Sequence, residues 1–219
     1  MNARRILILA PHTDDAELGC GGTIARAVDE SHEVFVAAYS IAEESLPDGV
    51  PETQLLKEFE TSMARLGVRE DRTFVQRFRV RRFSEHRQEI LDDLVRLRSS
   101  IKPDLIFAPS TYDVHQDHMV VSAEAIRAFK HSTIWGYELP WNHLESHLSG
   151  FVTLSKAHIG TKWAALEAYA TQTELGRRYF TREVIFSLAT VRGVQIGAEY
   201  AEAFEVIRHV QSNERAISQ

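Results

Sequence analysis

The chain has 219 residues, of which 44% are hydrophobic and 26% are charged, and its formal net charge is −6. These values predict one globular domain spanning residues 1–219 with a sizeable core. The acidic balance argues against nucleic acid as a partner, because phosphate binding favours a basic surface. No segment is apolar enough over a sufficient length to span a bilayer, and nothing at the N-terminus is typical of a secretory signal. The only cysteine, Cys20, allows no internal disulfide, so we expect a cytoplasmic protein and leave homo-oligomerisation open.

Short apolar runs alternate with segments of helical periodicity. Strands are predicted over residues 5–10, 33–39, 73–80 and 105–108, and helices over 18–29, 51–66, 84–99 and 119–130. This alternation predicts βαβ units and a Rossmann-like α/β fold, with a mostly parallel sheet flanked by helices. The last third is less regular. Strands over 134–139, 151–154, 184–191 and 201–206 and a helix over 156–169 predict an elaborated C-terminal section.

A histidine and two carboxylates directly follow the first predicted strand. Open α/β sheets bind ligands at the carboxyl ends of their strands, and imidazole with carboxylate suits a divalent metal. His12 and Asp15 are three residues apart in a tight turn and are candidate metal ligands, which leaves Asp14 as a candidate general base toward an activated water. Acidic residues before a helix also act as caps, and this cluster alone supports helix capping equally well.

A second cluster follows the predicted strand over 105–108. Here His118 is the candidate third ligand, and three ligands with one open position are typical of catalytic zinc. We expect His115 to face a substrate oxygen as an imidazolium, and Asp117 to orient an imidazole. Helix capping by Asp113 and Asp117 is the alternative, and it is weakened because both clusters follow strands of one sheet.

Three glycines after the first strand raise the question of a dinucleotide site. The fingerprint G-x-G-x-x-G would need glycine at position 24, where Ile24 stands. We therefore expect no nicotinamide cofactor, and we assign Gly19, Gly21 and Gly22 to close packing of the helix on the sheet.

Arginines and one tryptophan are candidates for substrate contact. Three alternate along the predicted strand over 73–80 and are expected at a solvated edge: Arg77, Arg79 and Arg81. Arg82, on the opposite parity, and Arg87, at the start of the next helix, are candidates to bind an anionic substrate group. Trp141 follows a predicted strand and is a candidate sugar contact, with simple burial as the alternative.

Several of these segments together resemble one known family. Residues 11–24, PHTDDAELGCGGTI, resemble the N-terminal signature of the PIG-L/LmbE family of zinc-dependent N-deacetylases. Residues 115–118, HQDH, resemble its second motif, and Gly193, Gly197 and residues 200–204, YAEAF, resemble its C-terminal tail. Thr13 and Gln116 stand where the family usually has proline.

The resemblance implies a role for each matching residue. It implies Zn²⁺ held by His12, Asp15 and His118, with Fe²⁺ tolerated by the same ligands. Asp14 would be the general base, His115 would stabilise the oxyanion and protonate the leaving amine, and Asp117 would support an imidazole. These assignments are those expected from the residues alone.

The implied reaction removes an N-acetyl group from a small amino-sugar conjugate, such as one of N-acetylglucosamine, and releases acetate. Two other functions are weighed against it. A metal-dependent phosphoesterase with two metals would need more ligands than the sequence offers. A sugar-binding module that has lost catalysis would not be expected to retain Asp14 and all three ligand positions.

Overall fold

A computed structural model describes residues 4–47 and 49–211 of the chain. Seven strands form one sheet in the order β3-β2-β1-β4-β5-β7-β6. The strands are β1 (Arg5–His12), β2 (Glu33–Ser40), β3 (Thr73–Val75), β4 (Leu105–Pro109), β5 (Thr133–Tyr137), β6 (Gly150–Leu154) and β7 (Tyr200–Arg208). The helices are α1 (Asp15–Asp29), α2 (Gln54–Leu66), α3 (Arg87–Ile101), α4 (Gln116–Ala128), α5 (Lys156–Leu166), α6 (Ala170–Glu174) and α7 (Arg182–Val194).

The sheet is mostly parallel, and β1 lies at its centre. β1 pairs in parallel with β2 and β4, β2 pairs with β3, and β4 pairs with β5. β7 is antiparallel to both of its neighbours, β5 and β6. The strand residues of β1 from Ile6 to Pro11 are buried, because helices cover both faces of a parallel sheet. The predicted Rossmann-like α/β fold is thereby confirmed.

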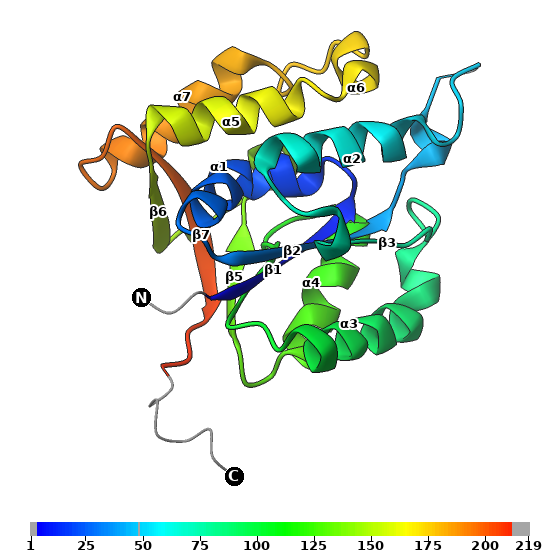
Figure 1. Cartoon of the computed structure of the whole chain (residues 1–219). Helices are drawn as coiled ribbons and strands as arrows, with labels where there is room; N and C mark the ends of the chain where they lie inside the picture. The colour runs from blue at the N-terminus through cyan, green and yellow to red at the C-terminus, as the bar shows by residue number, and fades with distance from the viewer. Residues whose placement is uncertain (1–3, 48, 212–219) are drawn as a thin grey trace.

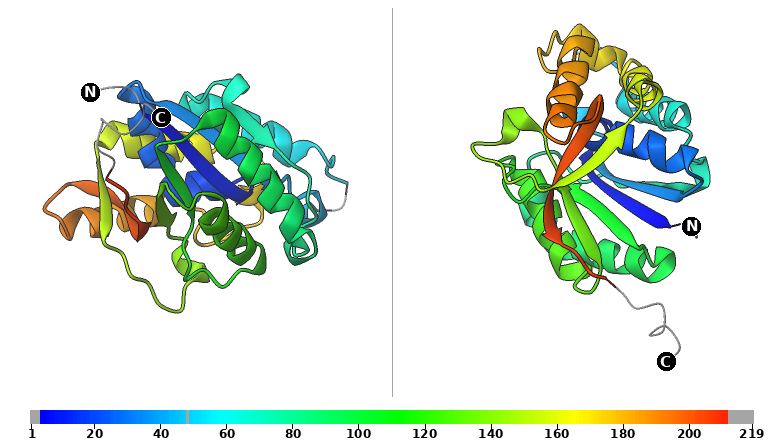
Figure 2. Two further views of the ribbon diagram at one scale, coloured as in Figure 1. Left: turned by 90° about the horizontal axis from the view of Figure 1, so that it is seen from below. Right: turned by 90° about the vertical axis from the view of Figure 1, so that its left-hand side faces the viewer.

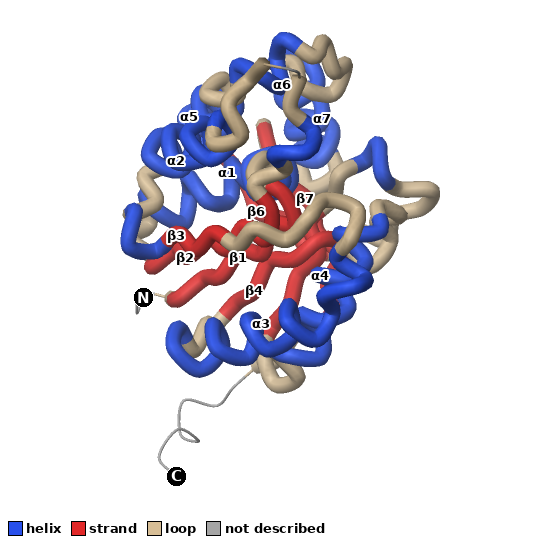
Figure 3. The backbone as a smooth tube through the Cα atoms, turned by 90° about the vertical axis from the view of Figure 1, so that its right-hand side faces the viewer, coloured by secondary structure: helices blue, strands red, loops and turns tan. Residues whose placement is uncertain are grey.

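Two helical layers enclose the sheet (Figures 1 and 3). Helices α3 and α4 cover one face, and their apolar side chains form one hydrophobic cluster with β1 and β4. Helices α1, α2 and α5 cover the other face and contribute to a second cluster. The elaborated C-terminal section adds β6, α5 to α7 and β7, and Figure 2 shows β6 and β7 at one edge of the sheet. Within the described residues, no helix is both long and apolar enough to cross a membrane.

Glycines let α1 approach the sheet closely. A Cβ built on Gly19 would lie 2.3 Å from a ring carbon of Tyr137, and one on Gly22 would lie 2.4 Å from a methyl of Leu154. Real side chains do not tolerate such distances, so these positions require glycine. The packing on the sheet that the sequence predicts is confirmed for Gly19 and Gly22, whereas Gly21 faces the Lys162 side chain of α5.

The strand predicted over residues 184–191 is wrong, because this segment lies within α7. Its buried residues Ile185, Ala189 and Gly193 are four apart and so form one face of a helix. The side chain of Thr181 accepts a hydrogen bond from the Val184 N–H and caps the helix. A local run of β-branched and aromatic residues favoured a strand, and the tertiary packing against β7 decided for the helix.

The third strand ends at Val75, five residues before its predicted end. The chain then forms a loop over the end of the sheet, where the Phe78 N–H still bonds to the Tyr39 carbonyl. At Arg81 the backbone adopts φ +67°, which side-chain-bearing residues rarely take. Arg77, Arg79 and Arg81 therefore lie outside the strand, and they do not share one face of it as the sequence predicts.

Candidate metal centre and active-site cavity

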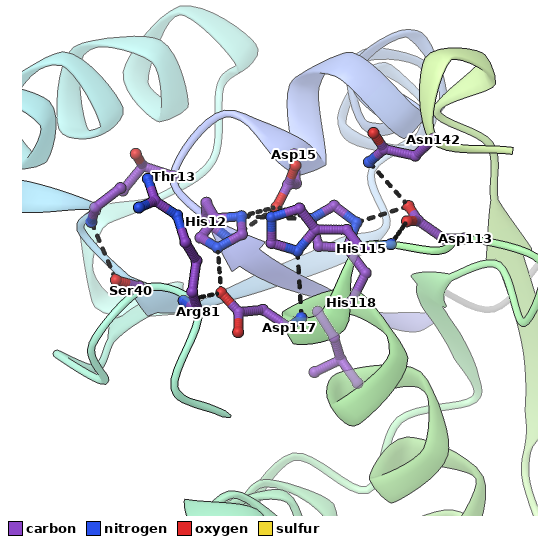
Figure 4. Close-up of polar contacts among 12 residues, drawn as sticks. His12, Thr13, Asp15, Ser40, Arg81, Asp113, His115, Asp117, His118 and Asn142 are labelled. Atoms are coloured by element: carbon purple, nitrogen blue, oxygen red, sulfur yellow. Dashed lines mark hydrogen bonds and ion pairs between the residues drawn. The ribbon is translucent and has the colours of Figure 1, made fainter. Parts of the chain in front are cut away.

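Three donor atoms converge where β1 and α4 meet (Figure 4). His12 Nδ1 lies 3.1 Å from Asp15 Oδ2, and His118 Nε2 lies 3.2 Å from the same oxygen. The two ring nitrogens are 3.3 Å apart. The sequence placed these residues in two clusters more than 100 positions apart, and the parallel pairing of β1 with β4 brings them together.

Two further carboxylates fix which nitrogen of each ring is free. His12 Nε2 lies 3.0 Å from Asp117 Oδ2, and His118 Nδ1 lies 2.7 Å from Asp113 Oδ2. When each ring is neutral, a hydrogen on this outer nitrogen is donated to the facing carboxylate. In that form the lone pairs of His12 Nδ1 and His118 Nε2 point to the same place as Asp15 Oδ2, the arrangement found around protein-bound metals.

The triangle of donor atoms fits a tetrahedral ion. Nitrogen and oxygen ligands about 2.0–2.2 Å from a tetrahedral zinc lie roughly 3.3–3.6 Å from one another. The observed edges of 3.1–3.3 Å are close to that spacing. The rings of His12, His115 and His118 also gather, with one nitrogen of each within 4.8 Å of the others. The set that includes Asp15 is tighter and leaves His115 free for another role.

The buried charges of this cluster shift one another's pKa values. Burial by itself lowers the pKa of His118, but the carboxylates of Asp15 and Asp113 raise it to about 10. Burial by itself would raise the pKa of Asp15, yet the two imidazoles hold it far below its usual range. The site thus favours positive charge at the point where the three donor atoms meet.

His115 lies beside the triangle as a neutral ring. Its Nδ1 accepts the N–H of Asp117 at the start of α4, so the hydrogen of the neutral ring is on Nε2. Burial, together with the neighbouring rings of His118 and His12, lowers the pKa of His115 to about 4. The imidazolium expected from the sequence is therefore wrong, and the ring can act as a neutral donor.

Asp14 precedes α1 and faces the cavity. Among the described residues its side chain makes no capping bond to the helix, which disfavours the capping alternative at this position. Burial and the adjacent Asp15 raise the pKa of Asp14 to about 6. Asp15 is also not a cap, since its Oδ2 accepts the backbone N–H of His12 at 2.8 Å.

A cavity of about 290 Å³ opens over this cluster. Its lining includes Asp14, His115 and Trp141, all of which the sequence proposed for the site. It also includes three residues with no sequence-derived role in substrate binding: Arg81, Arg177 and Tyr179. No sequence signal pointed to them, because two lie in irregular loops and Arg81 was assigned to a solvated edge.

Arg82 and Arg87 are not among the residues that line the cavity. Arg82 forms an ion pair with Glu85 at 2.8 Å, and Arg87 forms one with Glu124 at 2.5 Å. The cavity contact expected for these two arginines is not found. β3 ends early, and the loop after it places Arg81 rather than Arg82 at the cavity, whereas Arg87 is held by Glu124 on α4.

Asp113 and Thr13 gain clearer roles from the structure. Asp113 was considered only as a helix cap, and it does accept the His115 N–H at 2.8 Å, but its other oxygen holds His118. The Thr13 side chain is buried, and its carbonyl accepts a hydrogen bond from the Tyr169 hydroxyl.

Solved structures with the same fold come from proteins of different activity. The conserved protein TT1542 from Thermus thermophilus is 28% identical, with a TM-score of 0.78 over 96% of this chain and 97% of that chain. The N,N'-diacetylchitobiose deacetylase from Pyrococcus horikoshii is 22% identical, with a TM-score of 0.77 over 93% and 84%. The 4-carboxy-2-hydroxymuconate hydratase from Pseudomonas putida is 20% identical, with a TM-score of 0.76 over 96% and 99%. The fold alone therefore does not select a reaction.

A family model described as PIG-L: GlcNAc-PI de-N-acetylase matches residues 7–129. The matched segment covers more than half of the chain and contains both the His12 cluster and the His115 cluster. The chain therefore belongs to the PIG-L, or GlcNAc-PI de-N-acetylase, family.

Proposed function

We propose that this protein is a metal-dependent hydrolase that removes the N-acetyl group from a small amino-sugar conjugate and releases acetate. The observation that carries the proposal is the triangle of His12 Nδ1, Asp15 Oδ2 and His118 Nε2, with edges of 3.1–3.3 Å. The family membership and the deacetylases among the structural neighbours support the same reaction.

His12, Asp15 and His118 would hold one divalent ion, with zinc as the first candidate and ferrous iron as the alternative. When bound, such an ion would make water more acidic and would polarise an amide carbonyl. Asp113 and Asp117 contribute by keeping both imidazoles in the ligating tautomer and orientation.

The chain's own residues supply the proton transfers. Asp14 lines the cavity without a capping bond among the described residues, so its carboxylate is free to take a proton from the attacking water. His115 Nε2–H donates to the carbonyl oxygen as that oxygen becomes negative. The proton that Asp14 took from the water then passes to the amine nitrogen as the C–N bond breaks, which leaves acetate and a free amino group.

The metal site is tested by elemental analysis of the purified protein. We expect about one divalent ion per chain, as for a single three-ligand site. Asp113→Asn should weaken metal affinity about 10–100-fold, because it removes the negative charge and leaves one acceptor oxygen for both the His115 N–H and His118 Nδ1–H. Asp92→Asn, on the exposed face of α3, is the matched control and should bind metal normally.

The reaction is tested by acetate release from a panel of N-acetylated sugar glycosides. Asp14→Asn should retain the metal and lose about 10²–10⁴-fold in rate. Full activity of Asp14→Asn would exclude it as the base. Phosphate release from phosphomonoesters instead would favour the phosphoesterase, and sugar binding without any hydrolysis would favour the inactive binding module.

A further inference from the structure

We propose that Arg81 and Arg177 bind an anionic group of the substrate, a carboxylate or a phosphate attached to the acetamido sugar. This inference rests on the proposed function and specifies the class of its substrate. It starts from the two guanidinium groups in the lining of the cavity that contains Asp14 and His115.

The two guanidinium groups differ from the neighbouring arginines in their ion pairs. Among the described residues, no carboxylate lies within ion-pair distance of Arg81 or Arg177, whereas Arg79, Arg82 and Arg87 are each paired with a glutamate. The only side-chain hydrogen bond that Arg177 makes within the described chain is to the Tyr179 hydroxyl, at 2.6 Å. Both groups therefore offer most of their donors to a ligand, and a guanidinium matches carboxylate and phosphate oxygens with paired donors.

The backbone fixes Arg81 relative to the metal triangle. Its N–H donates to Asp117 Oδ2 at 2.6 Å, and the same oxygen accepts His12 Nε2–H at 3.0 Å. Its φ of +67° is strained for any residue except glycine. Figure 4 shows its side chain extending from Asp117 past His12 toward Thr13. The backbone angle and this N–H bond fix where the Arg81 side chain leaves the chain, beside the histidines of the triangle.

Arg177 is positioned from the other wall of the cavity. Its guanidinium lies 5.9 Å from the centre of the Tyr179 ring, and Tyr179 stacks on Trp141 with ring centres 4.1 Å apart and planes at 11°. An aromatic pair of this kind is a suitable wall for the apolar face of a sugar ring. The cavity thus joins a hydrolytic centre, an aromatic wall and two free cations.

A second role for Arg177 must be separated from this one. Its charge also acts on Asp14, opposing the effects that raise the pKa of that carboxyl. If this were its only role, its removal would slow the reaction on every substrate. If it binds an anion, its removal would weaken only the substrates that carry one.

The experiment compares three matched ligands: methyl N-acetylglucosaminide, the carboxymethyl glycoside of the same sugar, and N-acetylglucosamine 1-phosphate. Binding is measured by calorimetry on metal-loaded Asp14→Asn protein, and kcat/KM is measured on the protein with Asp14 intact. Arg81→Gly removes the side chain and tolerates the positive φ, and Arg177→Ala removes the other guanidinium. Arg82→Ala and Arg178→Ala, at adjacent exposed arginines outside the cavity lining, are the matched controls.

We expect at least one anionic glycoside to bind about tenfold or more tightly than the methyl glycoside, as for hydrogen bonds to a charged group. This preference should collapse in Arg81→Gly and Arg177→Ala and persist in both controls. Comparing the carboxymethyl and phosphate arms identifies the anion. Thermal melts of all four variants establish that each is folded.

Equal affinity for the three ligands, or a preference that survives both variants, would overturn the proposal. An equal loss of kcat/KM on all three ligands in Arg177→Ala, without a change in relative affinity, would show that Arg177 acts only through Asp14. That result would overturn the claim that Arg177 binds the anion. Absence of acetate release from every glycoside, with the binding preference intact, would refute the deacetylase function and not the anion site.

Discussion

Replacing Lys162 with methionine should destabilise the protein by about 3 kcal/mol, because Lys162 and Glu202 form a buried ion pair across a break in α1. Helix α1 leaves helical geometry at Cys20, with φ −146° and ψ 25°. A regular helix would join the Leu18 carbonyl to the Gly22 N–H. Here the Lys162 ammonium donates to the Leu18 carbonyl at 2.8 Å, and Glu202 accepts the Gly22 N–H at 3.0 Å.

The magnitude follows from what the substitution leaves behind. Removing one partner of a buried pair costs about 3–5 kcal/mol, since the other charge stays buried. Glu202 keeps three donors, the Gly22 N–H and the N–H and hydroxyl of Thr23, which favours the lower end of that range. For a chain of this length, about 3 kcal/mol corresponds to a decrease in Tm of roughly 6–12 °C.

The assay is reversible unfolding in urea, followed by circular dichroism, with a thermal melt as a second measurement. Lys57→Met, at an exposed lysine on α2, is the matched control and should change the free energy of unfolding by less than about 0.5 kcal/mol. The double variant Lys162→Met/Glu202→Gln should lose less free energy of unfolding than the sum of the two single variants, because it leaves no unpaired buried charge.

Two results would refute this reasoning. A cost below about 1 kcal/mol for Lys162→Met would show that the pair does not stabilise the break. Strict additivity in the double variant would show that the two side chains act independently, even if each single change is destabilising.

Three further predictions concern α1. Gly19→Ala should strongly destabilise the protein in urea unfolding, because its Cβ would meet the Tyr137 ring, whereas Gly160→Ala in the middle of α5, with open space around it, should be neutral or stabilise by about 0.5–1 kcal/mol. Burial raises the pKa of Glu17 to about 8 from an ordinary 4.5, so the folded state holds the proton more tightly. The stability of metal-free protein should therefore fall between pH 4.5 and pH 8 by about 1.4 kcal/mol per unit at most, and Glu17→Gln should flatten this dependence in unfolding curves measured across that range. Burial also raises the pKa of the Cys20 thiol, so iodoacetamide should label it only after denaturation, as judged by mass spectrometry; rapid labelling of folded protein would contradict its burial.

The parts of the fold that the sequence predicted correctly are those with a strong local period. The apolar body of β1 and the spacing of Leu55, Phe59 and Met63 in α2 each determine an element without help from the rest of the chain. The segment around Ile185 has a mixed pattern, and only its packing against β7 selects the helix. Local preference is weak where burial can override it.

The candidate site divides in the same way. The residue types and their place after two strands were sufficient to nominate His12, Asp15 and His118, because the ends of parallel strands meet at one edge of a sheet. Nothing in the sequence predicted that Asp113 would hold His118, or that Arg81 rather than Arg82 would face the cavity. Those outcomes depend on the geometry of loops, which have no regular residue periodicity from which side-chain orientation could be predicted.

The sequence by itself determined which groups are available at the carboxyl edge of the sheet, since His12, Asp14 and Asp15 follow an apolar run that predicts a strand. Only the tertiary structure decided which nitrogen of His12 and of His118 faces a carboxylate, that the pKa of His115 is lowered, and which cations line the cavity. The physical reason is that a residue's identity fixes which groups it can offer. Protonation, orientation and pairing are set by neighbours that the fold brings from distant parts of the chain.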